Sequence, residues 1–295
     1  MKAKRVALIL NVLASAALAL VATGAAAKAP PSDGDIDRAV VENLAKTYGA
    51  RAKVAAHVDL IGPFGTQSQW TLVVAKQPDE EGRAGPLEGA VSVCFVKGAE
   101  ADCSDALFLA HFKKLGITLL DGERPFHELH EARVVRADAS TPLLSLKACT
   151  AQSFNSDCAV STFLYAYDAR HDRFRPVFSN MTGRNNNQET RFIESGPLQG
   201  AVVVATPTYK APFVYELDVY RPAADGQYRR VLRHRGRTVY GDGNPLPVID
   251  SEMPALLGRF GHWKAGDALP VPPVLPAGCT RLYLRKGVEW CESKG

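Results

Sequence analysis

Six cysteines, arranged as three pairs close in the sequence, constrain the fold of this chain more than any other feature. Their spacings are C-x8-C, C-x8-C and C-x11-C. Cysteine pairs of this kind clamp hairpins in chains that fold in an oxidising compartment. A zinc site or a redox-active dithiol would need C-x2-C or cysteine–histidine spacings, which the sequence lacks. We therefore predict three local disulfides: Cys94–Cys103, Cys149–Cys158 and Cys279–Cys291.

The N-terminal segment predicts the compartment in which the chain folds. Three basic residues at positions 2, 4 and 5 precede an apolar run over 6–22 that is rich in Leu and Ala. Ala25, Ala26 and Ala27 then supply the small residues of a signal-peptidase site. The alternative is a retained membrane anchor, for which the run is marginal in length and only weakly hydrophobic. We predict a signal peptide over 1–27 and a mature protein that is periplasmic or secreted and does not span a membrane.

The charge balance argues against nucleic acid as a partner. The chain carries 35 Lys and Arg against 31 Asp and Glu, a formal net charge of +4. Lys2, Lys4 and Arg5 supply three of these charges, so cleavage of the signal peptide leaves +1. A global basic field, which drives binding to nucleic acid, is therefore not expected. No cofactor is predicted either.

Residues 28–50 predict a short linker followed by a helix. Asp33 or Asp35 is the expected N-cap, and Gly49 is expected to end the helix. Apolar residues recur at four-residue spacing and so line one helical face: Ile36, Val40, Leu44 and Tyr48.

Residues 51–268 predict one β domain. Segments rich in β-branched and aromatic residues are separated by turn formers, which is typical of strands. Short helices are expected at 106–115 and 253–260, and a Pro-rich linker at 269–278. Residues 279–295 predict a disulfide-clamped terminal hairpin. The expected strands of the domain are 70–74, 90–96, 142–146, 160–167, 201–205 and 213–220.

A faint internal repeat indicates how these strands are organised. Residues 167–178 and 220–232 both read as strand, polar turn, aromatic-Arg-x-Val and strand. Phe174 and Tyr228 lie 54 residues apart, and Cys94 and Cys149 lie 55 apart. The segments 144–148 and 201–205 occupy similar places upstream of the two repeats. A period near 50 with about four strands per unit predicts antiparallel blade-like meanders, partial or small propeller-like. The alternative is a β-sandwich.

Two polar segments are candidates for ligand binding. The first contains Arg184, Asn185, Asn186 and Asn187, and the second contains Asp242 and Asn244. Both compositions also suit ordinary tight turns. The second segment offers oxygen ligands for calcium but does not meet the EF-hand pattern, so we predict no metal. If the two turns lie at the same end of neighbouring blades, they form one polar surface.

An arginine-rich stretch over 229–237 is the third candidate. On a regular strand Arg229, Arg233, Arg235 and Arg237 share one face, and Arg230 lies on the other. Arg233 and Arg235 could bind phosphate, carboxylate or an acidic partner. The alternative is a solvated face that pairs with carboxylates of a neighbouring strand, such as Glu216 and Asp218.

No catalytic motif is evident. His127 and His130 are three residues apart, whereas H-E-x-x-H places its histidines four apart. A nucleophile elbow, G-x-S-x-G, is also missing, and Ser195-Gly196-Pro197 lacks its pattern. We therefore predict an exported, non-catalytic β-rich binding protein of the cell envelope, with a protein or a glycan as its partner. The alternative is a periplasmic hydrolase of glycans or peptides that uses Asp242, Asp250 and Glu252, with Glu194 and Asp218 as further carboxylates.

Overall fold

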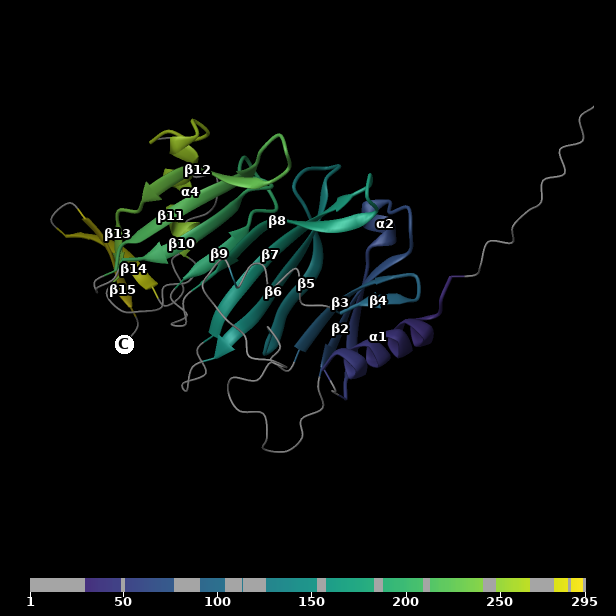
Figure 1. Cartoon of the computed structure of the whole chain (residues 1–295). Coiled ribbons are helices and arrows are strands. Elements are labelled where there is room, and N and C mark those ends of the chain that lie inside the picture. The colour runs from purple at the N-terminus through teal and green to yellow at the C-terminus, as the bar shows by residue number, and fades with distance from the viewer. Residues whose placement is uncertain are drawn as a thin grey trace, which may run out of the picture. The chain divides into compact units, whose positions relative to one another are not determined.

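A computed structural model shows that the chain is mainly β, with three four-stranded antiparallel sheets and an N-terminal helix (Figure 1). Pro31–Gly295 form one compact unit. The backbone alone is described for 48, 150–152, 158, 240, 279–285 and 288–293. The structure describes residues 30–48, 51–76, 91–103, 113, 126–152, 158–182, 188–208, 213–240, 248–265, 279–285 and 288–293.

Each four-stranded sheet is a meander in which sequential strands pair as neighbours. The first sheet contains β1 (Lys53–Asp59), β2 (Trp70–Lys76), β3 (Val91–Lys97) and β4 (Glu100–Asp102). The second contains β5 (Glu128–Arg136), β6 (Pro142–Gln152), β7 (Cys158–Asp168) and β8 (Arg173–Met181). The third contains β9 (Glu189–Phe192), β10 (Val202–Pro207), β11 (Tyr215–Pro222) and β12 (Tyr228–Arg235). The described strands do not form a closed ring.

The other elements named for the described residues are two further helices and a small sheet. Helix α2 (Ile61–Phe64) follows β1, and helix α4 (Val248–Arg259) follows the third meander. Strands β14 (Cys279–Arg285) and β15 (Val288–Ser293) form the expected terminal hairpin. Strand β13 (Thr238–Tyr240) adds to β15 in parallel, which the sequence did not predict. Among the described residues, no helix combines the length and the apolar character needed to cross a membrane.

Helix α1 (Asp33–Tyr48) lies where the spacing of its apolar residues predicts it. Its N-terminus is capped by a reciprocal pair: Asp35 N–H donates to Ser32 Oγ, and Ser32 N–H donates to Asp35 Oδ2. The N-cap is therefore Ser32, so the prediction of Asp33 or Asp35 as the cap is wrong; Asp35 lies three residues on, as in a capping box. Ile36, Val40 and Leu44 are buried against the first sheet.

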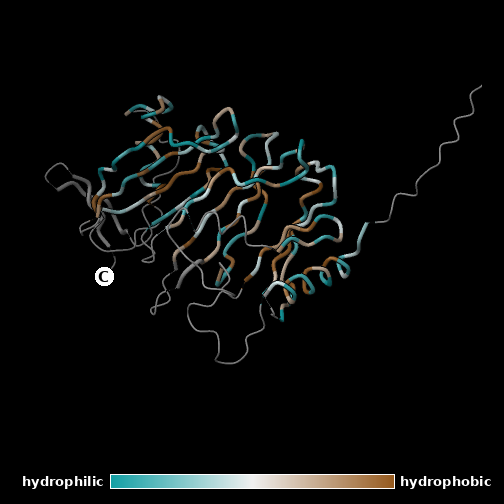
Figure 2. Tube along the Cα trace, viewed as in Figure 1, coloured by the Kyte–Doolittle hydropathy of each residue, from teal (hydrophilic) through white to brown (hydrophobic). Residues whose placement is uncertain are grey.

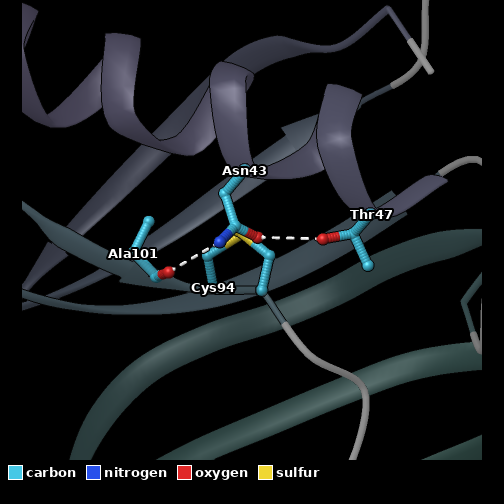
Figure 3. The surroundings of a disulfide bond; sticks show 5 residues. Asn43, Thr47, Cys94 and Ala101 are labelled. Carbon is cyan, nitrogen blue, oxygen red and sulfur yellow. Dashed lines mark hydrogen bonds between the residues drawn. A yellow bond between two sulfur atoms is a disulfide. The ribbon is translucent and has the colours of Figure 1, made fainter. Parts of the chain in front are cut away.

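One of the three predicted disulfides, Cys94–Cys103, is confirmed. Cys94 of β3 bonds Cys103, the residue that follows β4, and so clamps this hairpin under α1 (Figure 3). Asn43 of α1 donates to the carbonyl of Ala101 at 2.9 Å, which fixes the helix over the clamp. Cys149 is also disulfide-bonded. Its partner and the third predicted pair involve side chains outside the described ones, so both remain predictions.

Hydrophobic residues are concentrated along inner strands such as β10, whereas the edge strand β12 is largely hydrophilic (Figure 2). One cluster, which includes Phe95 and Phe163, joins the faces of the first and second sheets. Another, which includes Val177 and Val204, joins the second and third sheets. The opposite face of the third sheet packs on α4. Because each sheet is covered, the chain buries apolar area along a series of meanders rather than in a single core.

The internal repeat corresponds to real structural equivalence. Its two copies are the hairpins β7–β8 and β11–β12, the third and fourth strands of their meanders. Phe174 and Tyr228 both stand at the beginning of a fourth strand. The cysteine spacing, in contrast, is coincidental, because Cys94 lies on a third strand and Cys149 on a second strand. The helix expected at 253–260 is confirmed and begins earlier, at Val248. Of 106–115, only residue 113 is described.

Candidate functional site

A pocket of about 390 Å³ lies between helix α4 and the chain that links β9 to β10. Met253 and Leu257 of α4 form part of its apolar wall. The opposite rim is the turn of Ser195, Gly196 and Pro197. The pocket therefore has one apolar side on a helix and one side built from the backbone of a turn.

Two glycines shape that turn. Gly196 has a φ of 77°, in the left-handed region that glycine adopts without steric cost. Its carbonyl accepts a hydrogen bond from the N–H of Gln199 at 2.9 Å. Gly200 also has a φ of 77°, and a Cβ there would lie 2.3 Å from the carbonyl oxygen of Ala137. Gly196 therefore permits the conformation of the turn, and Gly200 permits its close contact with the β5–β6 hairpin.

An ion-pair network forms the polar floor of the pocket. Arg191 donates from Nε to Glu189 at 2.6 Å and from a terminal nitrogen to Asp250 of α4 at 2.5 Å. Burial raises the pKa of Glu189 above its usual value, although Arg191 opposes the shift. The Arg191 guanidinium is partly exposed and stays fixed between two carboxylates. It joins the third sheet to α4 and presents a rigid polar group to the pocket.

Glu194 forms the outer rim, where Arg133 of β5 holds it. Two nitrogens of Arg133 donate to its two carboxylate oxygens, at 3.0 and 2.5 Å. These hydrogen bonds lower the pKa of Glu194. Glu194 is therefore ionised at neutral pH and is not suited to act as a general acid.

The turn exposes backbone groups that a ligand can use. No described residue accepts a hydrogen bond from the N–H of Ser195 or of Gly196. Free backbone groups beside an apolar wall suit a polypeptide segment, which carries both matching donors and acceptors and apolar side chains. A sugar ring would instead favour an exposed aromatic face. Among the described lining residues, the only aromatic one is Phe192, which is 7% exposed.

Of the described carboxylates named in the hydrolase alternative, only Glu194 and Asp250 line the pocket, and arginines bind both. Asp250 and Glu252 are two residues apart on α4, so they point to opposite faces of the helix. Glu252 is buried beneath α4, where its Oε2 lies 3.7 Å from Nε2 of buried His234. Asp218 lies on β11 and binds arginines instead. Asp242 lies outside the described residues.

The arginine-rich stretch occupies β12, an edge strand of the third sheet. Arg233 donates to both carboxylate oxygens of Asp218, at 2.7 and 2.8 Å, and Arg230 donates to Asp218 at 3.2 Å. Arg235 stands opposite Glu216 in the strand register. The pairing alternative is thus confirmed for Arg233. Arginines along an exposed edge also oppose the addition of further strands.

The predicted face of two of these arginines is wrong. The register skips Val231, so β12 bulges there and the alternation of side chains changes phase. Arg230 therefore shares a face with Arg233, and Arg229 lies on the other. A regular strand would have placed them the other way round.

The structure does not describe the other predicted site residues. Arg184, Asn185, Asn186, Asn187, Asp242 and Asn244 lie outside the described residues, so the polar surface they were expected to form remains a prediction. The described residues contain no group of three His, Cys, Asp or Glu that could hold a metal ion. Conversely, the sequence did not indicate Arg191, Met253 and Leu257 as site residues. Their signal was weak, because the first is separated from Asp250 by 59 positions and the others read as ordinary helix core.

Comparison with known proteins adds no assignment, because no protein-family model, curated protein or solved structure matches this chain.

Proposed function

We propose that this chain is an exported, non-catalytic binding protein of the cell envelope, and that its pocket beside α4 holds a polypeptide segment of a partner. The observation that carries the proposal is the pairing of unused backbone N–H groups at Ser195 and Gly196 with an apolar helix wall. Charges in the pocket are already paired within the protein, so a ligand gains mainly from backbone hydrogen bonds and apolar burial.

Export is part of the proposal. Residues 1–27 have the pattern of a signal peptide, and Cys94–Cys103 is a disulfide of the kind that persists in oxidising compartments. We place the mature protein in the periplasm or outside the cell, where a partner would meet it.

The fold suits a rigid binding scaffold. We interpret the three meanders as blade-like units of a partial, propeller-like assembly, since successive sheets share buried clusters face to face. In such an assembly, turns and helices at the sheet edges are free to carry the binding surface.

Crosslinking in the cells that export the protein tests this function. A photoreactive amino acid replaces Ser195 at the pocket rim or, as the control, exposed Ile61 on α2. We expect position 195 to capture a specific envelope polypeptide through one segment, and position 61 to capture none of it. A glycan at position 195, or the same adducts at both positions, would contradict the proposal. Cleavage of the captured segment by the purified protein would favour the hydrolase alternative instead.

A further inference from the structure

The turns of the two repeat hairpins meet in a second hollow. It measures about 530 Å³ and is lined from the β7–β8 turn by Asp168, Arg170 and His171, and from the β11–β12 turn by Asp225. Arg175 of β8 lines it as well. The hollow is separate from the pocket beside α4 and shares no lining residue with it.

Arg175 is held in a fixed position across the two turns. Its guanidinium donates to the carbonyl of Asp225 at 3.1 Å. Gly226 makes this approach possible, because a Cβ there would lie 2.8 Å from a terminal nitrogen of Arg175. Gln227 donates to the carbonyl of Pro176 at 3.1 Å. Two hydrogen bonds thus join β8 to the β11–β12 turn, and the first of them orients the Arg175 guanidinium before any ligand arrives.

The two carboxylates of the hollow are already in use. Asp168 lies 2.7 Å from His171 Nδ1 and accepts a hydrogen bond from the backbone of Arg170 at 3.1 Å. Asp225 accepts from the N–H of Gln227 at 3.0 Å and from Arg229 at 2.7 Å. The hydrogen bond from His171 lowers the pKa of Asp168. Those from Gln227 and Arg229 lower the pKa of Asp225. Both groups are ionised at neutral pH, and their charges are compensated locally.

Two arginines therefore line the hollow, and neither pairs with a carboxylate of a described residue. No described residue accepts a side-chain hydrogen bond from Arg170, and the acceptor of Arg175 is a neutral carbonyl. Guanidinium groups present planar forks of donors that match the oxygens of phosphate and carboxylate groups. Two of them in one concavity favour an oxyanion over a neutral or cationic ligand.

We infer that the hollow between the β7–β8 and β11–β12 turns binds an oxyanion group, phosphate or carboxylate, through Arg170 and Arg175. This site is additional to the proposed function and does not depend on it. The internal repeat explains why such a site can arise, since equivalent hairpins of neighbouring meanders bring their turns together.

Calorimetric titration of the full exported protein with inorganic pyrophosphate, and separately with citrate, tests the site at low ionic strength. We expect saturable binding of at least one probe, which R170Q weakens by about tenfold or more, the effect of one lost charge-assisted contact. Binding of pyrophosphate alone would identify phosphate as the ligand chemistry, and binding of citrate alone would identify carboxylate. Salt should weaken the binding, because the site is exposed.

Two controls keep the result interpretable. R136Q removes another exposed arginine, on β5, that lies outside the hollow, and it should bind the probe as the original protein does. R175K retains the charge but loses the fork that binds the Asp225 carbonyl and the ligand, so it should bind the probe more weakly than the original protein. Binding that R170Q and R136Q affect equally, or no saturable binding of either probe, would overturn the inference. Neither result would bear on the pocket beside α4.

Discussion

Asp172 joins the first and second sheets, and its replacement should measurably loosen the fold. The residue sits in the β7–β8 turn of the second sheet with a φ of 44°. Its carboxylate accepts from Trp70 Nε1 at 2.9 Å and from Tyr167 Oη at 2.7 Å, and it pairs with Lys97 Nζ at 2.8 Å. The hydroxyl of Ser68 donates to it as well. Trp70 and Lys97 lie on the first sheet, and Ser68 lies just before β2. The Asp172 side chain therefore connects the second sheet to the first.

The cleanest perturbation is D172N, because asparagine has the same shape and also tolerates the left-handed backbone. The amide oxygen can still accept from Trp70 and Tyr167, but only as a neutral group. The attraction to Lys97 is lost, and the amide nitrogen now faces Ser68 and Lys97. Since hydrogen bonds to charged groups contribute about 1.5–3 kcal/mol and neutral ones about 1, we expect a net loss of about 2 kcal/mol. In a folded unit of this size, a loss of about 2 kcal/mol lowers Tm by about 4–8 °C.

The pH dependence provides an independent check. Burial would raise the pKa of Asp172, but hydrogen bonds from Lys97, Ser68, Tyr167 and Trp70 outweigh it and hold the pKa well below its usual value. A group with a lowered folded pKa stabilises the protein above the unfolded pKa of about 3.9, and the contribution is lost as the pH falls further. The difference in unfolding free energy between the original protein and D172N should therefore be full at pH 7 and shrink below about pH 4.

Urea unfolding followed by circular dichroism, at pH 7 and at pH 3.5, measures both quantities. D33N is the matched control, because Asp33 is an exposed residue at the start of α1, and its replacement should change stability by less than about 0.5 kcal/mol. If D172N unfolds at the same urea concentration as D33N, Asp172 does not join the sheets as described. A difference that does not change with pH would refute the assignment of the effect to the ionised carboxylate.

Three further predictions follow from the same structure and the sequence. The exported protein should begin at Lys28, as N-terminal sequencing of the purified material would show, and an intact N-terminus would contradict cleavage after Ala27. Replacing Cys94 and Cys103 together by alanine should cost about 2–3 kcal/mol, the loop-closure entropy of a ten-residue ring, measured by urea unfolding. E252A should cost about 2–3 kcal/mol because it removes a buried side chain and leaves a cavity beneath α4; a loss below about 1 kcal/mol would show that Glu252 is not buried in solution.

The sequence predicts the elements of this fold better than their pairing. Four-residue spacing predicted α1, and runs of β-branched residues predicted β2, β3 and β10, because each pattern reports local burial. The parallel contact of β13 with β15 joins segments about 50 positions apart, and no local pattern encodes it. The bulge at Val231 likewise depends on how β12 meets β11, so the faces of Arg229 and Arg230 could not be inferred from alternation.

The candidate site shows the same division. The sequence indicated Asp250 and Glu252 as candidate site carboxylates. Which of them faces the pocket depends on where α4 begins and how it packs. The local sequence around Arg191 indicated little of its role, because that role comes from a contact with Asp250 across 59 positions. The turn at Ser195–Pro197 was noticed only as the lack of a nucleophile elbow. That the N–H groups of Ser195 and Gly196 have no acceptor among the described residues can be known only from the folded structure.

The most direct test of the binding function is the affinity of the segment captured at position 195 for three forms of the protein. The segment, made as a synthetic peptide, is titrated into the original protein, into S195Y, which fills the pocket rim, and into Q199Y. Gln199 is an exposed residue of the same loop outside the pocket, so Q199Y controls for the added aromatic ring. We predict that S195Y binds at least about tenfold more weakly, a loss of about 1.4 kcal/mol, while Q199Y binds as the original protein does. Equal affinity for all three forms would contradict the placement of the partner in this pocket.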